Sequence, residues 1–491
     1  MYTIGYDVGS SSIKACLLDI ETNQVIASGQ YPKVEMPMIA LQPGWAEQKP
    51  EMWWDAIVQV TSELSAVSGK PLSEVKAIGI SYQMHGLVVV DKDLQVLRPS
   101  IIWCDSRAVP FGRRAFEELG EVYCQQNLLN SPGNFTAAKL AWIAEHERSI
   151  YESVHKIMLP GDYIAMKLSG ATTTTYSGLS EGIFYDFQTN DISHEVMDYF
   201  GFSDGILPNI TPTFGEQCYV SKEASQLLGL REGIPISYRA GDQPNNALSL
   251  NVLKPGELAA TAGTSGVVYG VSDQLKNDPY FRVNSFAHVN HNDQQKRLGV
   301  LLCINGTGIL NAWMKRTLSV SSYPEMNTLA SNVPIGSDGL TILPFGNGSE
   351  RILKNNSVGS SVHGISFNTH NKGHMVRATQ EGIACSFRYG LDIMREMGIQ
   401  PEVIRAGRAN LFLSGIFQEA IANLSGATIE LYETDGAQGA ARGAGIGLGV
   451  YNQDNAFQGL EMLKEIKPDT EQRDQYETTY NRWLNVLSTS I

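Results

Sequence analysis

The sequence predicts an α/β protein of two domains. Its 491 residues exceed the roughly 250 to 300 residues that one hydrophobic core usually organises. Short apolar segments typical of strands alternate along the chain with longer segments that have helical spacing, as in α/β proteins. The pattern that opens the chain also recurs near its middle, which indicates one structural unit present twice.

The chain is expected to open with an antiparallel meander of three strands. Polar turn residues separate the short apolar runs that predict these strands, over residues 3–8, 13–18 and 24–30. A helix is predicted next, over residues 50–68, with Trp53 and Ile57 on its apolar face. Buried strands are expected over residues 75–82 and 87–90.

The repeat divides the chain. Residues 7–19 and 261–273 align without a gap and keep a glycine, a serine and the final aspartate in place. Chance similarity of two hairpins is the alternative to duplication, but residues 254–257 (Lys-Pro-Gly-Glu) supply turn residues just before the second copy. We therefore predict domains over residues 1–253 and 254–491. A helix over about 454–487 is expected to cover the second domain.

Charge and cysteine content limit the partners and the compartment. The chain has 51 acidic and 37 basic residues, a net charge of −14, which repels nucleic acids and anionic lipids. No apolar run reaches the ~18 to 20 residues of a membrane span, and no basic secretion signal opens the chain. The six cysteines lie far apart, unlike a disulfide or zinc framework. We expect a cytoplasmic protein with no nucleic-acid or membrane partner, and a homodimer stays open.

The turn after the first strand suits a phosphate group. Residues 9–12 offer backbone N–H groups and three hydroxyls, and Lys14 adds a positive charge. Asp7, just before this turn, is placed to hold Mg²⁺ directly or through water. A plain polar hairpin is the alternative, but a matching turn at 263–266 favours a polyphosphate gripped at both ends. No P-loop motif is present.

A second acidic residue follows a strand near the middle of the chain. Residues 236–247 read as a strand that runs into a helix, with Pro244 at an early helical position. Asp242 then lies at a strand end, where α/β sheets bind ligands. A carboxylate there can accept the proton of a sugar hydroxyl that attacks a phosphoryl group. The alternative is an aspartate that caps the helix.

Polar side chains also follow two other apolar strands. Residues 83–86 include Met84 and His85, and residues 103–107 include Trp103 and Asp105. Few, well-placed polar groups of this kind read sugar hydroxyls, although a lone histidine is more often structural. Glycines between residues 436 and 449 indicate close backbone approach, either to a flat ligand or, more safely, to a neighbouring element.

Two short segments match motifs of other enzyme classes. Residues 178–182 match the GxSxG nucleophile motif, but a strand rather than the required helix is predicted after it. His370 and His374 have the spacing of a zinc-binding pair, but a glycine lies between them and no third ligand is placed. Neither a hydrolase nor a metalloprotease is expected.

Together these residues resemble the FGGY carbohydrate kinase family, from residue 7 to about 451. The order and spacing of the matching segments are specific, namely residues 7–14, 44–48, 139–143, 241–243, 262–266 and 435–441. Within the family, residues 84–86 and 103–107 look most like xylulokinases, which phosphorylate the terminal hydroxyl of D-xylulose with ATP and Mg²⁺.

The resemblance implies a fold, a reaction and a set of contacts. The fold is two actin-like (ribonuclease H-like) ATPase domains with a central cleft, and the phosphoryl transfer is direct. Asp242 would be the catalytic base and Asp7 would assist the metal. The implied sugar contacts are Met84, His85, Trp103, Asp105 and Gln243. The implied ATP contacts are Gly9, Ser10, Ser11, Ser12, Lys14, Gly263, Thr264, Ser265, Gly306, Ala406, Gly407 and Asn410.

Two departures from xylulokinases keep the sugar open. Arg408 stands in an adenosine loop that in many xylulokinases reads Gly-Gly-Gly-Ala, and it is placed to stack on the base. Gln243 stands where xylulokinases often have asparagine, and glycerol kinases also have glutamine there. The alternatives are a ribulo-, glucono-, glycerol or autoinducer kinase, or a sugar-sensing relative without catalysis. The intact Asp7 and Asp242 speak against the last.

Overall fold

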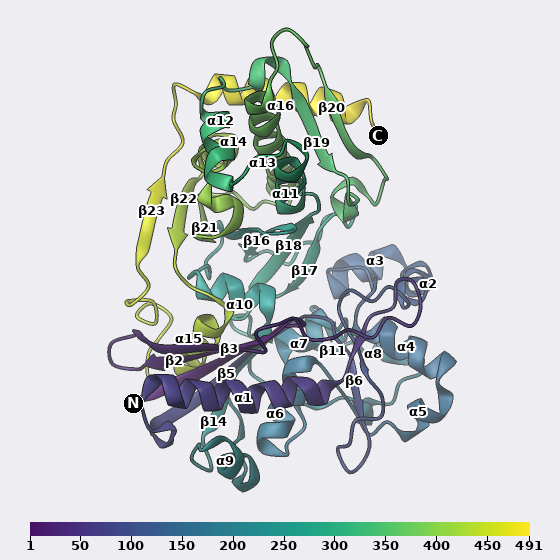
Figure 1. Ribbon diagram of the computed structural model, residues 1–491. Coiled ribbons are helices and arrows are strands. Elements are labelled where there is room, and N and C mark those ends of the chain that lie inside the picture. Colours follow the sequence, from purple (N-terminus) through teal and green to yellow (C-terminus); the bar gives the residue numbers. More distant parts are fainter.

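The computed structural model describes residues 1–491 and forms two lobes, each built on one large mixed sheet (Figure 1). The first sheet has the strand order β13-β14-β5-β1-β2-β3 and the second β17-β18-β16-β15-β21-β22-β23. The strands of the first sheet are β1 (Tyr2–Val8), β2 (Ile13–Asp19), β3 (Val25–Tyr31), β5 (Val75–Tyr82), β13 (Phe214–Tyr219) and β14 (Pro235–Gly241). Those of the second are β15 (Glu257–Ala262), β16 (Gly266–Ser272), β17 (Asn284–Ala287), β18 (Leu298–Ile304), β21 (Val403–Gly407), β22 (Thr428–Tyr432) and β23 (Met462–Ile466).

The two sheets repeat one topology. In the first, β1, β2 and β3 form the predicted antiparallel meander, and β5 and β14 continue the sheet parallel to β1. In the second, β15, β16 and β18 are antiparallel, and β21 and β22 run parallel to β15. Residues 9–12 and 263–265 are the equivalent first turns of the two sheets, which confirms the place that the sequence repeat predicts for them.

The first sheet brings three strand ends to one edge. Val8 pairs with Tyr82, and Tyr82 pairs with Gly241, so β1, β5 and β14 end in register. Whatever follows these strands therefore lies at the same edge of the sheet, where α/β proteins bind ligands.

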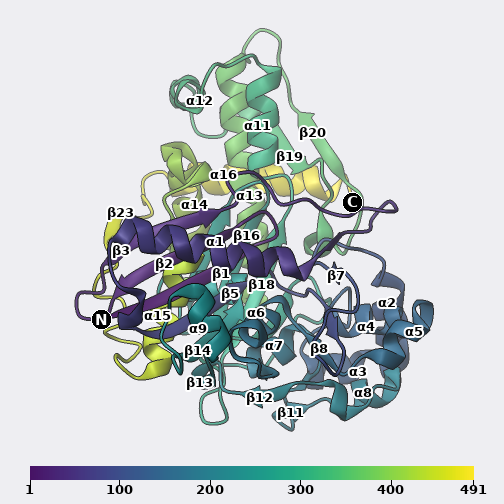
Figure 2. The same ribbon diagram turned by 60° about the horizontal axis from the view of Figure 1, so that its bottom comes forward.

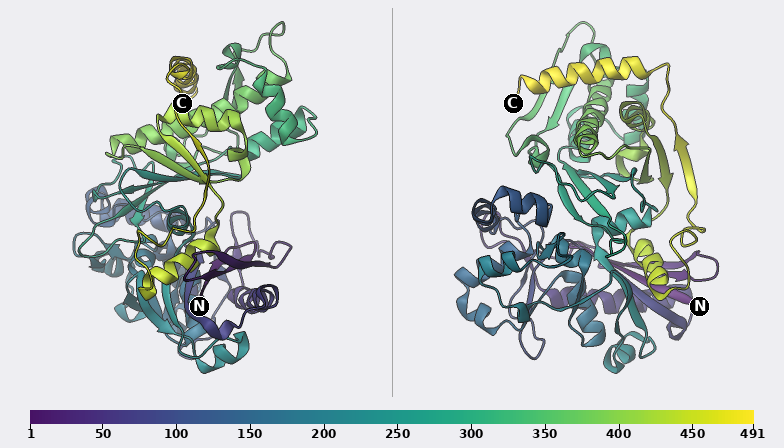
Figure 3. Two further views of the ribbon diagram at one scale, coloured as in Figure 1. Left: turned by 90° about the vertical axis from the view of Figure 1, so that its left-hand side faces the viewer. Right: turned by 180° about the vertical axis from the view of Figure 1, so that it is seen from behind.

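Helices cover both faces of the first sheet. The hydroxyl of Tyr6 meets Thr61 of α1 (Pro50–Ser68) at 2.7 Å. The preceding residue, Gly5, lies on the other face of the sheet, because successive residues of a strand face opposite sides. There α15 (Gly436–Leu448) packs against β1 and β5, although it follows a strand of the second sheet. Figure 2 shows α1 along the meander, and Figure 3 shows α15 beside the first sheet.

Glycines let α15 approach the sheet at backbone distance. A Cβ on Gly5 would lie 2.0 Å from the Ala437 carbonyl oxygen, and one on Gly79 would lie 1.9 Å from that of Ala440. On the helix side, a Cβ on Gly443 would lie 2.5 Å from the Tyr238 ring. The late glycine series therefore packs the helix on the sheet, which is the safer of its two interpretations.

The tail of the chain differs from the prediction. One helix was expected over about residues 454–487, but β23 first joins the edge of the second sheet, pairing with β22. Only then does α16 (Arg473–Ser488) cover the second lobe. The prediction was wrong here because the five residues of β23 are too few to give a clear alternation, and an available sheet edge decides their conformation.

The remaining elements complete the two lobes. The helices are α2 (Val109–Leu119), α3 (Glu121–Tyr123), α4 (Thr136–His146), α5 (Arg148–Ser153), α6 (Pro160–Ser169), α7 (Tyr176–Glu181), α8 (His194–Phe200), α9 (Lys222–Leu228), α10 (Asp242–Ser249), α11 (Gly308–Thr317), α12 (Tyr323–Ser331), α13 (Lys372–Glu396) and α14 (Gly415–Ser425). The short strands are β4 (Glu47–Gln48), β6 (Val88–Val90), β7 (Ser100–Ile101), β8 (Lys156–Met158), β9 (Thr173–Thr175), β10 (Tyr185–Asp186), β11 (Asp191–Ile192), β12 (Asn209–Thr211), β19 (Thr341–Phe345) and β20 (Gly359–His363). None of the helices has the length and apolar character needed to cross a membrane.

Candidate active site

Asp7 lies near the end of β1, where a serine contacts its carboxylate and a lysine is its cross-strand neighbour. The Ser81 hydroxyl donates a hydrogen bond to Oδ1 at 2.9 Å, and Lys14 faces Asp7 across the hairpin. Gly436, the first residue of α15, is so close that a Cβ on it would lie 2.4 Å from Oδ2. Burial raises the pKa of Asp7, while Ser81 and Lys14 lower it.

Asp242 lies at the neighbouring strand end and begins α10. Gly241 is the N-cap of this helix and no side-chain capping bond is formed there, so Asp242 is the first helical residue and not the N-cap residue. Burial and the charge of Asp7 raise the pKa of Asp242 to about 7, although Gln243 N–H favours the ionised form. A carboxyl group with a pKa near neutrality is suited to act as a general base in the cell's pH range.

Unsatisfied polar atoms gather beside Asp242. Both polar atoms of the Gln83 side chain, Nδ1 of His85 and Oε1 of Gln243 are buried without a hydrogen-bond partner. Buried polar groups are costly to leave unpaired, so this concentration is typical of a site whose ligand supplies hydroxyl groups. Met84 is buried and lines the same place, since a Cβ on Gly241 would lie 2.5 Å from its Cγ.

His85 contributes a neutral imidazole held between aromatic rings. Its ring centroid lies 4.6 Å from that of Phe135 and 5.4 Å from that of Phe286. Burial, and then the nearby Lys139, lower the pKa of His85 to about 3. A neutral imidazole can both donate and accept a hydrogen bond, as a sugar hydroxyl requires.

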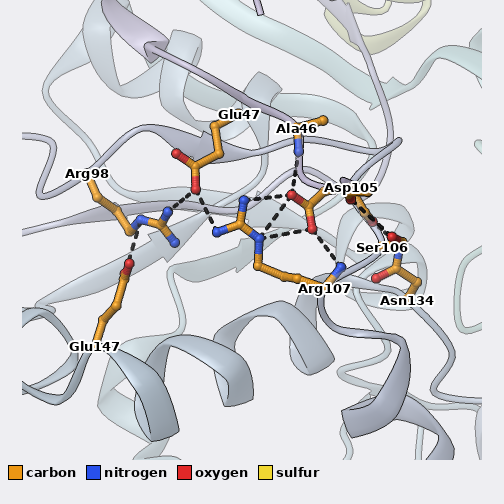
Figure 4. A network of polar contacts seen from close by, with 9 residues as sticks. Ala46, Glu47, Arg98, Asp105, Ser106, Arg107, Asn134 and Glu147 are labelled. Carbon is orange, nitrogen blue, oxygen red and sulfur yellow. Dashed lines mark hydrogen bonds and ion pairs between the residues drawn. The ribbon is translucent and has the colours of Figure 1, made fainter. Parts of the chain in front are cut away.

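Asp105 takes part in a buried ion-pair network instead of lying open to a ligand (Figure 4). Its carboxylate accepts bonds from the Ala46 N–H at 2.6 Å and from Arg107 Nη2 at 2.7 Å. Arg107 also pairs with Glu47 at 2.6 Å and lies 3.8 Å from the centre of the Trp45 ring. These partners occupy both carboxylate oxygens, and the sugar contact of Asp105 stays a prediction.

The first predicted phosphate turn is fixed by its neighbours. Gly9 N–H donates to the Ser12 carbonyl at 3.2 Å, and Gln48 Nε2 donates to the Ser10 carbonyl at 2.7 Å. The half-exposed Trp103 lies over the turn, with Nε1 3.4 Å from Ser10 Oγ. Because the carbonyls are engaged while the N–H groups of Ser10, Ser11 and Ser12 bind no backbone oxygen, the turn presents donors to an anion.

The second turn is braced by the start of α11. Gly308 N–H donates to the Gly263 carbonyl at 2.8 Å, and Ile309 N–H to that of Thr264 at 3.2 Å. Ser265 Oγ donates to Asn305 Oδ1 at 3.2 Å. Gly306, just before α11, has a positive φ of 84°, and a Cβ on it would lie 1.6 Å from the Pro344 carbonyl oxygen.

The predicted adenosine segment lies next to this second turn. Ala406 pairs with Ala260 on the neighbouring strand, and a Cβ on Gly263 would lie 3.6 Å from Asn410 Nδ2. No atom lies within 4 Å of a Cβ built on Gly407, so that glycine borders open space. The exposed Arg408 follows it. The fold thus brings the second turn and the predicted adenosine segment together, although their ligand stays a prediction.

The GxSxG segment and the His370/His374 pair have structural roles. Ser180 is buried in α7, its Oγ accepts the Ala287 N–H at 2.9 Å, and the strand β10 follows, as the sequence predicts. His374 Nε2 lies 3.0 Å from Asp338 Oδ2, and its ring joins the N-terminal cap of α13.

Sequence reasoning missed two residues at the site. Glu181 Oε1 accepts the His85 N–H at 3.1 Å, and Lys139 Nζ donates to the His85 carbonyl at 2.7 Å. Glu181 was passed over as the fourth residue of the GxSxG match, and Lys139 was noted only as part of a family segment. The sequence contains no signal for either residue, because their burial and their contacts with His85 are made by the fold, and charged residues are rarely buried without a specific partner.

Known proteins confirm the family and the two-domain α/β fold. Two models match, "FGGY family of carbohydrate kinases, N-terminal domain" over residues 2–249 and the C-terminal domain over residues 258–449. The xylulose kinase of Bacillus subtilis is 27% identical, over 99% of this chain and 97% of its own. That of Haemophilus influenzae is 29% identical, over 99% of each.

The solved xylulose kinase from Rhodospirillum rubrum has a TM-score of 0.90 at 25% identity, covering 100% of this chain and 99% of its own. Plasmodium falciparum glycerol kinase with ADP has the same fold, with a TM-score of 0.90 at 18% identity, covering 100% of this chain and 98% of its own. This chain belongs to the FGGY family of carbohydrate kinases and is a sugar kinase.

Proposed function

We propose that this enzyme transfers the γ-phosphoryl group of ATP to the terminal hydroxyl of D-xylulose. The relatives named xylulose kinases match nearly the whole chain, and residues 84–86 and 103–107 have the pattern seen in that group. The observation that carries the proposal is Asp242, a carboxyl group with a pKa raised to about 7 beside unpartnered polar atoms.

In the proposed reaction, Asp242 is the general base. It accepts the hydroxyl proton of the sugar as the hydroxyl oxygen forms a bond to the γ-phosphorus. The bond from that phosphorus to the β–γ bridging oxygen breaks, and ADP leaves with the electron pair. The proton stays on Asp242 until it passes to solvent. Met84, His85 and Gln243 orient the sugar, with hydroxyls in place of the missing partners of the buried polar atoms.

The two turns grip the nucleotide from both lobes in this proposal. The N–H groups of residues 10–12, with Lys14, bind one part of the polyphosphate, and Thr264 and Ser265 bind another. Asn410 and the open space at Gly407 lie beside the adenosine. These local donors are needed because the protein's net charge of −14 gives no general attraction for an anion.

The acidic groups at the strand ends fit Mg²⁺. This ion is usually held by one or two carboxylates together with substrate phosphates, and Asp7 offers a carboxylate whose only nearby cationic influence is Lys14. Asp7 would hold the ion directly or through water, with Asp242 nearby. The ion would supply charge neutralisation for the phosphates during transfer.

Another sugar or polyol is the second candidate because of Gln243. Its buried Oε1 lacks a partner, and the resemblance places glutamine here in glycerol kinases too. A coupled assay of ADP release across ketopentoses, gluconate, glycerol and other polyols tests the choice. We expect the highest kcat/KM on D-xylulose, and turnover of another sugar without D-xylulose would refute the specific assignment. The Asp242→Asn protein, purified in the same way, is the control for ADP release by contaminating kinases.

A cytoplasmic location is also part of the proposal. All six cysteines are unpaired thiols, four of them buried, and a reducing compartment maintains that state. A homodimer stays a prediction, for which molar mass by light scattering is the direct measurement.

A further inference from the structure

His85 has an unusual backbone. Its φ is +62°, a left-handed conformation that residues other than glycine seldom adopt. It directly follows Met84 at the end of β5, so this conformation decides where the imidazole lies in the sugar site. Strained residues at functional sites persist only where their surroundings hold them.

Two buried titratable side chains hold the His85 backbone, one at its N–H and one at its carbonyl. Glu181, the last residue of α7, accepts its N–H at 3.1 Å, and Lys139 of α4 donates to its carbonyl at 2.7 Å. Both side chains belong to residues with 0% exposure. Buried hydrogen bonds to the backbone are costly to lose, so two helices fix one residue.

The other oxygen of Glu181 reaches the strand that carries the base. A Cβ on Gly241 would lie 2.5 Å from Glu181 Oε2 and 2.5 Å from Met84 Cγ. Gly241 directly precedes Asp242, so Glu181 lies between the residues of the sugar site and the start of the base's helix. Oε2 itself is buried without a hydrogen-bond partner.

Glu181 is suited to this position as a neutral acid. Burial raises its pKa well above the usual value, and the charges of Asp242 and Asp162 raise it further. A neutral carboxyl group still accepts the His85 N–H, and it does not repel the carboxylate that takes the sugar proton.

We propose that Glu181 and Lys139 are positioning residues that hold His85 in the conformation that binds the sugar. The inference rests on the sugar-kinase function, in which His85 contacts the sugar, but not on which sugar is used. It predicts that the hydrogen-bonding ability of Glu181, not its charge, is what matters.

The test compares sugar and ATP kinetics in four variants of the full chain. Kinetics are measured with whichever panel sugar the wild type turns over fastest, so an error about D-xylulose leaves this test intact. Glu181→Ala and Lys139→Met are each expected to raise the KM for sugar about tenfold or more, because small misplacements of binding groups are costly. The KM for ATP should stay within about twofold. Glu181→Gln keeps an acceptor for the His85 N–H and should stay within about threefold of wild type for both substrates.

Ser221→Ala is the matched control in the same lobe. It removes the N-cap acceptor for the Ala224 N–H at the start of α9 and leaves His85 and its aromatic neighbours untouched, so the KM for sugar should not change. Circular dichroism and thermal melting of each variant report folding. If Glu181→Ala does not fold, Lys139→Met and Glu181→Gln carry the test.

Three results would overturn the inference. The first is a folded Glu181→Ala or Lys139→Met protein with a wild-type KM for sugar. The second is a Glu181→Gln protein as impaired as Glu181→Ala, since charge would then matter instead of the hydrogen bond. An equal rise in the KM for ATP would also contradict a role confined to the sugar site.

Discussion

At the scale of single residues, the site depends on carboxyl groups in different environments. Asp7 keeps a hydroxyl donor and a lysine nearby. Burial raises the pKa of Asp242 to about 7, and it raises the pKa of Glu181 well above its usual value. Acidic groups with different pKa values can take different chemical roles in one active site. Here one is suited to a metal, one to a proton and one to a backbone N–H.

Replacing the base should separate catalysis from binding. Asp242→Asn removes the proton acceptor while keeping the size of the side chain, so we expect kcat to fall by about 10² to 10⁴. Isothermal titration calorimetry should show sugar affinity close to wild type. A variant with wild-type turnover would show that another group accepts the proton.

The pH dependence of the reaction should report Asp242. Only the ionised carboxylate accepts a proton, so kcat/KM for sugar should fall about tenfold per pH unit below a pKa near 7. The free energy of unfolding should change with pH in the opposite direction. The folded state binds the proton of Asp242 more tightly than the unfolded state does, so this free energy falls as pH rises from about 4 to 7. Asp242→Asn should thus melt at a higher temperature than wild type at pH 8. A flat rate profile between pH 5 and 8 would contradict this assignment.

At the scale of elements, α15 is the part that joins the halves of the chain. It lies on β1 and β5 at backbone distance, and its first residue borders the carboxylate of Asp7. A change on the sheet below this helix should therefore reach the site, although no side chain of the site is altered.

Gly79→Ala tests that connection. The new methyl group would meet the Ala440 carbonyl at 1.9 Å, and backbone cannot move aside as a side chain can. We expect a loss of about 1 to 3 kcal/mol in the free energy of unfolding by urea, together with reduced kcat. Gly415→Ala is the control, because nothing lies within 4 Å of its Cβ at the start of α14. Equal stability of the two variants would disprove tight packing of α15.

Local patterns predicted the elements that their own sequence determines. The helix Pro50–Ser68 and the strand Val75–Tyr82 have the predicted bounds, since each has a clear periodicity and a proline or turn at its ends. The crossing of α15 and the edge strand β23 depend on surfaces made by distant residues. Asp242 was found because it ends a strand, whereas Glu181 was not, because only the fold brings α7 to His85.

At the scale of the whole molecule, the proposed ligands lie on different lobes. The proposed base Asp242 and the proposed sugar contacts Met84 and His85 follow strands of the first sheet, and the predicted adenosine segment lies at the end of a strand of the second. Phosphoryl transfer to a sugar must also exclude water, which would otherwise receive the phosphate. Both facts predict that the lobes move toward one another when both ligands bind.

Small-angle scattering measures that movement. The radius of gyration should decrease when sugar and a non-hydrolysable ATP analogue are both present, because the two lobes then share the ligands. Either ligand alone should cause a smaller change. An unchanged scattering curve with both ligands would count against closure.

The crossing of α15 also has a consequence for biosynthesis. The sheet face over Gly5 and Gly79 is made early on the ribosome, but the helix that covers it, Gly436–Leu448, is among the last elements translated. Synthesis at about 5 to 20 residues per second leaves that face exposed until nearly the whole chain has emerged. The nascent first lobe is therefore a natural client for chaperones, and a fragment ending at the linker between the lobes should be insoluble when expressed alone.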